Sequence, residues 1–260
     1  MKVIKPKKQS KNLKVFANTL RFYKQNFWSF TKIAAIVVLI SAIIKSYDLT
    51  HTNSSDIALI LYVAGLYTFL ALLWLNFNKK EGEKIKISEI YTSSSARFFP
   101  FLAVSLIQSL VSLPLIIGFV LIILTVGLGM LPVFVLIGGV LIIVSVILLI
   151  WYSMAGLVVV EEANLTSIKA LSRSKKLVKG NFFRLLIDYL IFILVIGFFS
   201  GLIINLITKI SFVADNWFFK GLIDGVLLTV ILSIVSIFGF NIYQDLKSRS
   251  NDQRPSQKKN

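Results

Sequence analysis

Six long apolar stretches, separated by short and mostly basic segments, dominate the pattern of this chain. They cover about residues 30–44, 57–77, 98–124, 133–160, 182–207 and 222–243. The hydrocarbon core of a bilayer is about 30 Å thick, and about 20 apolar residues of helix cross it. We therefore predict an all-α integral membrane protein whose six transmembrane helices form three hairpins, a membrane domain of residues 30–243.

The first stretch is shorter than a full span, and two interpretations of it are open. Trp28 and Tyr47 can extend it to both membrane interfaces, which gives a retained transmembrane helix. The alternative is a cleavable signal peptide. The basic segment before the stretch runs for about 30 residues, and no A-x-A cleavage site follows it, so the pattern favours a retained span.

The third and fourth stretches are longer than one crossing requires. Pro114 removes a backbone donor within the third, and we expect it to kink the helix there. In the fourth, we expect residues 153–160 to leave the hydrocarbon and run along the membrane interface. The uncharged sequence TVGLGMLP between the two stretches predicts only a turn.

Basic residues fall almost entirely on one side of the predicted spans. The side that includes the N-terminus holds 25 of the 28 Lys and Arg residues, in residues 1–32, 79–97, 169–184 and 247–259. The other side holds only Lys45, Lys209 and Lys220. Because cytoplasmic loops carry the excess of basic residues, we predict that both termini are cytoplasmic and that the protein lies in the cell (inner) membrane.

The composition favours lipid over soluble partners. The chain is 56% hydrophobic and only 15% charged, with a net charge of +16, whereas soluble domains are about a quarter charged. A soluble protein this basic would suggest nucleic acid. Here the charge lies directly beside apolar stretches, so we expect the lipid bilayer and anionic phospholipid as partners, with membrane proteins as further partners, and no nucleic acid.

The segment EEANLTSIKALSRSKKLVKGNFFRLL, residues 161–186, carries five Lys and Arg residues within eleven positions. On a helical wheel of 100° per residue, one face holds Leu177, Ala170, Ser174, Val178, Leu171 and Ile168. The other face holds the candidates for binding lipid headgroups, which are Lys169, Arg173, Lys175, Lys176 and Lys179. The pattern predicts an amphipathic helix in the headgroup plane over about residues 164–180.

The ends of this helix are marked by capping residues. Glu161 and Glu162 precede its positive end, Asn164 or Thr166 can cap it, and Gly180 is suited to the left-handed conformation that ends a helix.

Two small residues on the apolar face, Ala170 and Ser174, allow close approach of another helix. The favoured interpretation is therefore a connector docked beneath the bundle. A specific lipid-headgroup or ligand site on the basic face is the second interpretation, and a protein-binding surface is the third.

Related segments precede other spans. A basic-x-Asn-Phe sequence occurs twice, at Lys24–Phe27 and at Lys179–Phe182. The segment YTSSSARFFPF before the third span is less similar. Residues 1–29 also place apolar positions at three- and four-residue intervals. We therefore predict three successive units, each an interfacial amphipathic helix feeding a hairpin, followed by a basic, disordered cytoplasmic tail at residues 244–260.

Ionisable residues within a span are functional candidates by default, and Asp188 is such a residue. It follows Arg184 by four positions, so an ion pair with a snorkelling arginine is the favoured interpretation. A substrate or proton site is the alternative.

Two G-x-x-x-G pairs lie at the same predicted depth on the fifth and sixth spans. They are Gly197 with Gly201, and Gly221 with Gly225. Because small residues at this spacing permit close contact between backbones, we expect the two helices to cross closely there.

No catalytic residues, metal ligands or cofactor motifs are recognisable in the chain. It has no Cys and a single His, His51, and it lacks the G-x-S-x-G, P-loop and zinc-ligand patterns. The adjacent Glu161 and Glu162 would diverge by about 100° on a helix, so we interpret them as helix-start charges. We expect no enzymatic activity and no cofactor.

Residues 161–186 resemble the connector of the glycerophosphoryl diester phosphodiesterase membrane domain and of related uncharacterised six-span bacterial membrane proteins. The matching positions are Ala170, Leu171, Ser174, Leu177, Val178 and Gly180. The resemblance implies an integral membrane protein. In the named family a separate phosphodiesterase domain follows the membrane domain and carries catalysis. The chain ends seventeen residues after Tyr243, so we expect no such domain here.

These patterns lead to two hypotheses of function. The first is a non-enzymatic multi-pass protein of the membrane or envelope that acts through lipid or protein contacts. The alternative is a transporter or permease component for a small or lipid-like substrate.

Overall fold

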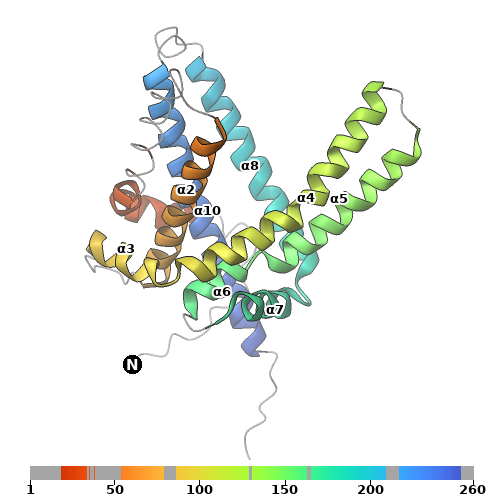
Figure 1. The fold of residues 1–260 in the computed structure, drawn as a ribbon. Coiled ribbons are helices and arrows are strands. Elements are labelled where there is room, and N and C mark those ends of the chain that lie inside the picture. Colours follow the sequence, from red (N-terminus) through yellow and green to blue (C-terminus); the bar gives the residue numbers. More distant parts are fainter. Residues whose placement is uncertain are drawn as a thin grey trace, which may run out of the picture. The chain divides into compact units, whose positions relative to one another are not determined.

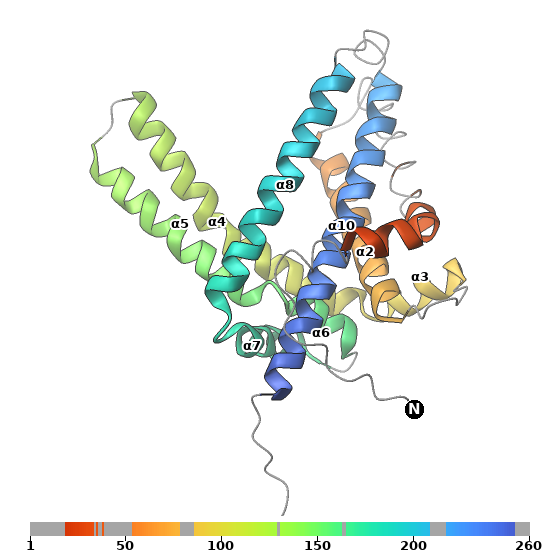
Figure 2. The ribbon, with the colours of Figure 1, turned by 180° about the vertical axis from the view of Figure 1, so that it is seen from behind.

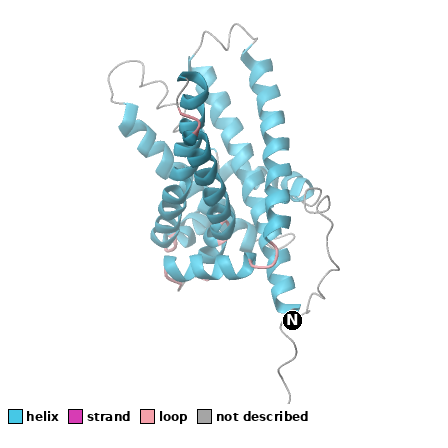
Figure 3. Cartoon of the chain, turned by 90° about the vertical axis from the view of Figure 1, so that its right-hand side faces the viewer, coloured by secondary structure: helices cyan, strands magenta, loops and turns pink. Residues whose placement is uncertain are grey.

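The structure is a computed structural model, and it describes residues 19–33, 35, 38, 54–78, 86–128, 131–162, 165–208 and 217–252. Within these residues the chain is helical, with short turns and no strand (Figure 3). Residues 19–33 form the first helical segment. The helices after it are α2 (Ser54–Asn78), α3 (Ile87–Ser95), α4 (Phe98–Leu128), α5 (Val133–Tyr152), α6 (Ala155–Glu161), α7 (Ser167–Val178), α8 (Phe182–Thr208) and α10 (Trp217–Asp252). The predicted all-α class is confirmed.

Four helical stretches of the described chain are long and apolar enough to cross a membrane. They are Phe98–Leu128, Val133–Glu161, Phe182–Leu206 and Leu222–Ser250, and they overlap the third to sixth predicted spans. The second predicted span lies within α2, whose residues Tyr62–Asn78 form a shorter apolar helix. Most of the first predicted span lies outside the described residues. Several apolar helices thus indicate a membrane protein.

The chain divides into two compact units. One comprises Met1–Phe98 with Ile187–Asn260, and the other comprises Phe99–Leu186. Each unit is described below by itself.

The second unit is built on the hairpin of α4 and α5, which lie side by side (Figures 1 and 2). The two backbones touch at a pair of buried glycines. A Cβ atom added to Gly118 would lie 2.6 Å from the carbonyl oxygen of Gly138, and one added to Gly138 would lie 2.7 Å from the carbonyl oxygen of Gly118. The absence of both side chains therefore permits this close crossing.

Polar side chains also join the two helices of the hairpin. Ser145 Oγ donates a hydrogen bond to the carbonyl oxygen of Val111 at 3.1 Å, and Gln108 Nε2 donates to that of Tyr152 at 2.7 Å. These bonds satisfy polar groups where lipid offers no partner. Helix α4 continues through Pro114 as one helix.

The fourth predicted span breaks where the sequence suggested. Helix α5 ends at Tyr152, a turn at Ser153 and Met154 follows, and α6 begins at Ala155. Phe101 of α4 packs against this short helix, since a Cβ atom on Gly156 would lie 3.0 Å from the Phe101 ring. Helix α6 is thus separate from α5, and it packs against the hairpin near the start of α4.

In the other unit, α2 packs against α10 through aromatic rings and one buried amide. The Phe77 ring lies edge-on to the rings of Phe240 and Tyr243. Asn76 Nδ2 donates a hydrogen bond to Ser236 Oγ at 3.1 Å. Helix α8 meets α10 at Phe238.

A tyrosine pair connects three helical segments of the same unit. Tyr67 of α2 and Tyr91 of α3 stack with ring centroids 5.5 Å apart, and Tyr67 Oη donates a hydrogen bond to the carbonyl oxygen of Tyr91 at 2.9 Å. Tyr91 Oη in turn donates to the carbonyl oxygen of Ile33 at 2.7 Å. Burial, with a smaller effect of Tyr67, raises the pKa of Tyr91 to about 12. Helix α3 and residues 19–33 are thus anchored to α2.

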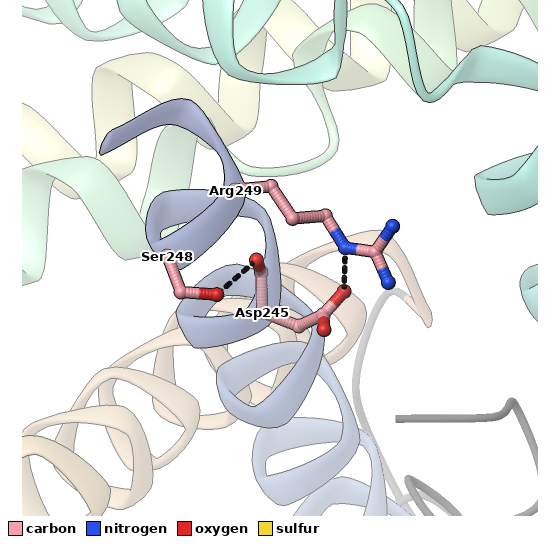
Figure 4. A network of polar contacts seen from close by, with 3 residues as sticks. All are labelled: Asp245, Ser248 and Arg249. Carbon is pink, nitrogen blue, oxygen red and sulfur yellow. Dashed lines mark hydrogen bonds and ion pairs between the residues drawn. The ribbon is translucent and has the colours of Figure 1, made fainter. Parts of the chain in front are cut away.

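The predicted disordered tail is wrong over its first nine residues. Helix α10 continues from the apolar stretch to Asp252, and Leu246 within this extension is only 1% exposed. Arg249 Nε pairs with Asp245 Oδ2 at 2.9 Å, one helical turn apart, and Ser248 Oγ donates a hydrogen bond to the Asp245 carbonyl oxygen (Figure 4). Burial and the i,i+4 pair extend the helix past the apolar residues. Residues 253–260 lie outside the described residues.

Candidate functional site

The basic connector forms helix α7 over Ser167–Val178, within the predicted 164–180. Thr166 occupies the N-cap position without a side-chain hydrogen bond to the helix, and Asn164 lies outside the described residues. Gly180 has a φ of +89°, as expected for the left-handed residue that ends a helix. The amide of Lys179 closes the last turn by donating to the Lys175 carbonyl oxygen.

One face of α7 is buried in the second unit. Its buried residues are Ala170, Ser174 and Val178, which recur every four positions, and each is 0% exposed. Helix α7 contacts both α5 and α6 (Figures 1 and 2). Ala170 and Ser174 are therefore packing residues, in agreement with the docked-connector interpretation.

Ser174 has a specific role in this contact, because it bridges the break between α5 and α6. Its Oγ donates a hydrogen bond to the Trp151 carbonyl oxygen at 2.7 Å and accepts one from the Met154 amide at 3.2 Å. A helix end leaves backbone groups without intrahelical partners. The Ser174 hydroxyl thus provides a hydrogen-bond partner for the Trp151 carbonyl group at the end of α5 and for the Met154 amide just before α6.

The opposite face of α7 is exposed and carries four lysines, which are Lys169, Lys175, Lys176 and Lys179. Ile168 lies on this face as well and is 76% exposed, although the helical wheel grouped it with the apolar residues. The face of α7 that is buried within the second unit is only as wide as the row of Ala170, Ser174 and Val178.

Two basic side chains of α7 have partners within the second unit. Arg173 Nη1 pairs with Glu162 Oε2 at 2.5 Å, which joins the end of α6 to α7. Lys175 Nζ lies 4.2 Å from the centre of the Trp151 ring, a cation–π contact. Glu162 was expected to be a helix-start charge, whereas it binds Arg173. Lys169, Lys176 and Lys179 are therefore the α7 cations best placed to meet an external anion.

Ser167 attaches the other end of α7 to the hairpin. Its Oγ donates a hydrogen bond to the carbonyl oxygen of Pro100 near the start of α4 at 3.2 Å. Bonds at Ser167, Arg173 and Ser174 thus position α7 along its whole length, and they hold the lysine face outward.

The first helical segment, residues 19–33, has a comparable exposed face. Leu20, Phe27 and Trp28 are exposed, Trp28 by 73%, and they alternate with exposed Arg21 and Lys24. Mixed aromatic and basic residues on one face are typical of a helix that lies in the membrane interface. Its polar Thr19 is buried and accepts a hydrogen bond from Asn241 Nδ2 of α10 at 3.0 Å.

Asp188 is buried in α8, with 7% of its surface exposed. Arg184 lies one turn earlier on the same helix. The ion pair between the two side chains stays a prediction, as does the alternative of a substrate or proton site at Asp188.

The predicted crossing of α8 and α10 at glycines is wrong for Gly197 and Gly201. No atom of another described segment lies within 4 Å of a Cβ atom added to either residue. Gly225 instead faces Val38, whose Cα lies 3.0 Å from an added Cβ. Helices α8 and α10 meet elsewhere, where the Phe192 and Phe238 rings stack 4.0 Å apart. Large aromatic rings at the contact keep the backbones apart. Of Gly221, only its helical backbone is described.

This difference between the glycines gives a matched pair of variants. We expect Gly225→Leu to destabilise the protein by about 1–3 kcal/mol, because the side chain must displace the Val38 backbone. We expect Gly201→Leu to have no effect, since its surroundings are open. Thermal unfolding of the purified protein in detergent measures both. Equal stability of the two variants would contradict the Gly225–Val38 contact.

No group of three or more His, Asp or Glu side chains in the described ranges is arranged to hold a metal ion.

Comparison with models of protein families, with curated proteins and with solved structures found no match to this chain. The resemblance of residues 161–186 to the glycerophosphoryl diester phosphodiesterase membrane domain therefore stays a prediction.

Proposed function

We propose that this chain is a non-enzymatic multi-pass protein of the cell membrane that acts through contacts with anionic phospholipid. In this proposal six spans cross the bilayer, both termini are cytoplasmic, and the exposed face of α7 lies against the inner leaflet. The spans within Phe98–Leu128, Val133–Glu161, Phe182–Leu206 and Leu222–Ser250 support the membrane location.

The observation that carries the proposal is the fixed, one-sided exposure of the α7 lysines. Ala170 and Ser174 are fully buried, while Lys169, Lys176 and Lys179 are exposed in a row on the other side. Each basic residue close to an anionic leaflet contributes about 1 kcal/mol. A row of lysines held toward the membrane surface therefore favours anionic over neutral lipid.

The triple variant Lys169→Gln/Lys176→Gln/Lys179→Gln tests the proposal. We expect its preference for phosphatidylglycerol over phosphatidylcholine to fall about tenfold or more, because three lysines together contribute several kcal/mol at low salt. Quenching of tryptophan fluorescence by brominated lipid, with the full chain in mixed-lipid vesicles, measures this preference. The wild-type preference should weaken in 0.5 M salt, which screens surface charge.

A matched control removes the same charge from the tail, in Arg254→Gln/Lys258→Gln/Lys259→Gln. We expect this variant to keep most of the lipid preference. The proposal fails if the two triple variants lose the preference equally, because net charge alone would then explain the binding.

A transporter or permease component is the second candidate, and buried Asp188 favours it. An ionisable residue within an apolar span is a candidate for a substrate or proton site. Loss of uptake of a small or lipid-like substrate in Asp188→Asn, with normal membrane insertion, would support this candidate over the first.

A further inference from the structure

The first helical segment, residues 19–33, is fixed within its own unit at both ends. At its start, Asn241 Nδ2 of α10 donates a hydrogen bond to Thr19 Oγ1 at 3.0 Å. At its end, Tyr91 Oη of α3 donates one to the Ile33 carbonyl oxygen at 2.7 Å, and Ile33 is 0% exposed. These contacts determine which face of the segment is buried in the described part of the chain and which face stays exposed.

The exposed surface of this segment has an apolar flank and a cationic flank. With the direction of buried Thr19 set to 0° and steps of 100° per residue, Phe27 and Leu20 lie at about 80° and 100°. On the same wheel, Arg21 and Lys32 lie at about 200° and 220°. All four of these side chains are exposed. The apolar and cationic side chains therefore leave the helix in different directions.

Trp28 lies between the two flanks, at about 180° on the same wheel, and it is 73% exposed. Its ring is edge-on to the Phe27 ring, with the ring centroids 5.7 Å apart. The Phe27 ring is also edge-on to Tyr23, again at 5.7 Å. Tryptophan is enriched where hydrocarbon meets water, because its ring is apolar and its N–H is polar. The order of side chains around the segment thus follows the order of layers in a bilayer leaflet.

The level and direction of the segment agree with a place at the membrane boundary. The apolar stretch of α10 ends at about Tyr243, and charged residues begin at Asp245. Asn241, which binds Thr19, therefore lies near the end of this stretch. Figures 1 and 2 show residues 19–33, in red, running across α10 rather than alongside it. A helix that crosses a membrane-spanning helix at this level lies in the interface plane.

We infer that residues 19–33 form a second lipid-binding surface, in which Leu20 and Phe27 insert among the acyl chains and Arg21 and Lys32 reach the headgroups. Lipid fits this surface because the segment TLRFYKQNFWSFTKI contains no Asp or Glu, so its charge complements anionic headgroups. Apolar burial dominates here, whereas the α7 surface is a row of lysines. The inference rests on the membrane location in the proposed function and not on the α7 lysines.

Spin labels on single cysteines test this inference, because the chain has no native Cys. The variants are Leu20→Cys and Phe27→Cys on the apolar flank, and Arg21→Cys and Lys32→Cys on the cationic flank. The labelled full chain is placed in vesicles of phosphatidylcholine and phosphatidylglycerol. Electron paramagnetic resonance then measures collisions with oxygen, which dissolves in hydrocarbon, and with a nickel chelate, which stays in water. We expect the ratio of oxygen to nickel collisions to be several times higher on the apolar flank.

Two results would overturn the inference. Frequent nickel collisions at residues 20 and 27 would show that the apolar flank faces water. Rare collisions with both reagents would show that protein, either another part of this chain or a partner, covers the flank. Leu110→Cys is the reference for a lipid-facing label, because Leu110 is a 63% exposed residue of apolar helix α4. All labelled positions are exposed, so the variants should keep the wild-type Tm.

Salt and the α7 triple variant separate this surface from the proposed function. In 0.5 M salt the collision ratios at residues 20 and 27 should stay the same, because salt screens charges and not apolar burial. The α7 triple variant should also keep these ratios. Loss of the α7 lipid preference alone would therefore leave this inference intact. Loss of the difference between the two flanks alone would overturn it and leave the α7 proposal intact.

Discussion

Alanine at Gly138 is expected to destabilise the α4–α5 hairpin strongly, whereas alanine at the adjacent Gly139 is expected to be neutral or slightly stabilising. The added Cβ at Gly138 would lie 2.7 Å from the Gly118 carbonyl oxygen and 3.0 Å from Ile122 Cγ1. The Gly118 carbonyl group belongs to the backbone and cannot rotate away as a side chain does, so α4 and α5 must move apart. Overpacking of this kind costs about 1–3 kcal/mol or more. At Gly139 no described atom lies within 4 Å of an added Cβ, and alanine is the better helix former by about 1 kcal/mol.

Thermal unfolding in detergent measures these effects, with an expected fall in Tm of several degrees for Gly138→Ala. Gly118→Ala should behave in the same way, because its Cβ would meet the Gly138 carbonyl oxygen at 2.6 Å. The double variant should cost less than the two single costs together, since one separation of the helices relieves both clashes. Equal Tm values for Gly138→Ala and Gly139→Ala would show that the backbones do not touch.

Replacement of Ser174 by alanine is expected to destabilise the connector, although it removes only one oxygen atom. The Trp151 carbonyl oxygen and the Met154 amide would both lose the partner that Ser174 Oγ provides. A buried polar group left unsatisfied costs about 1–3 kcal/mol, and here two groups are affected. Ser172→Ala, at an exposed position of the same helix, is the matched control and should leave the stability unchanged.

Hydrogen exchange gives this prediction a local measurement. The Met154 amide should exchange faster in Ser174→Ala than in the wild type or in Ser172→Ala, because its acceptor is gone. Unchanged protection of Met154, or equal stability of the two alanine variants, would show that Ser174 does not brace the turn between α5 and α6.

The sequence predicted the connector well where local patterns determine the structure. The alternation of small and basic residues identified α7, its buried Ala170 and Ser174, and its end at Gly180. The predicted apolar face is wider than the row of residues that is buried in the second unit, because a wheel shows direction but not how far a partner helix extends around it. The contact between Arg173 and Glu162 was also missed, since it depends on how the chain turns between α6 and α7.

The glycine contacts illustrate the same limit. Gly197 and Gly201 have the spacing of a helix-packing motif, yet spacing along one helix does not reveal whether another helix arrives there. Gly118 and Gly138 lie on different helices, ten residues before the end of α4 and five residues after the start of α5. No spacing within one helix connects the two glycines, so the sequence did not identify the pair.

The helical extension of α10 to Asp252 could not be predicted from the sequence, because a charged sequence becomes ordered only when a residue such as Leu246 finds a packing partner.

Two consecutive residues of α7, Ser174 and Lys175, contact the last turn of α5 through different interactions. Ser174 binds the Trp151 backbone, and Lys175 lies over the ring of that same tryptophan. A roll of α7 about its own axis by a single residue, a 100° step, would break both contacts together. The contacts with this one tryptophan therefore fix the rotational orientation of α7. The direction in which its exposed lysines point is set when the protein folds, before any ligand arrives.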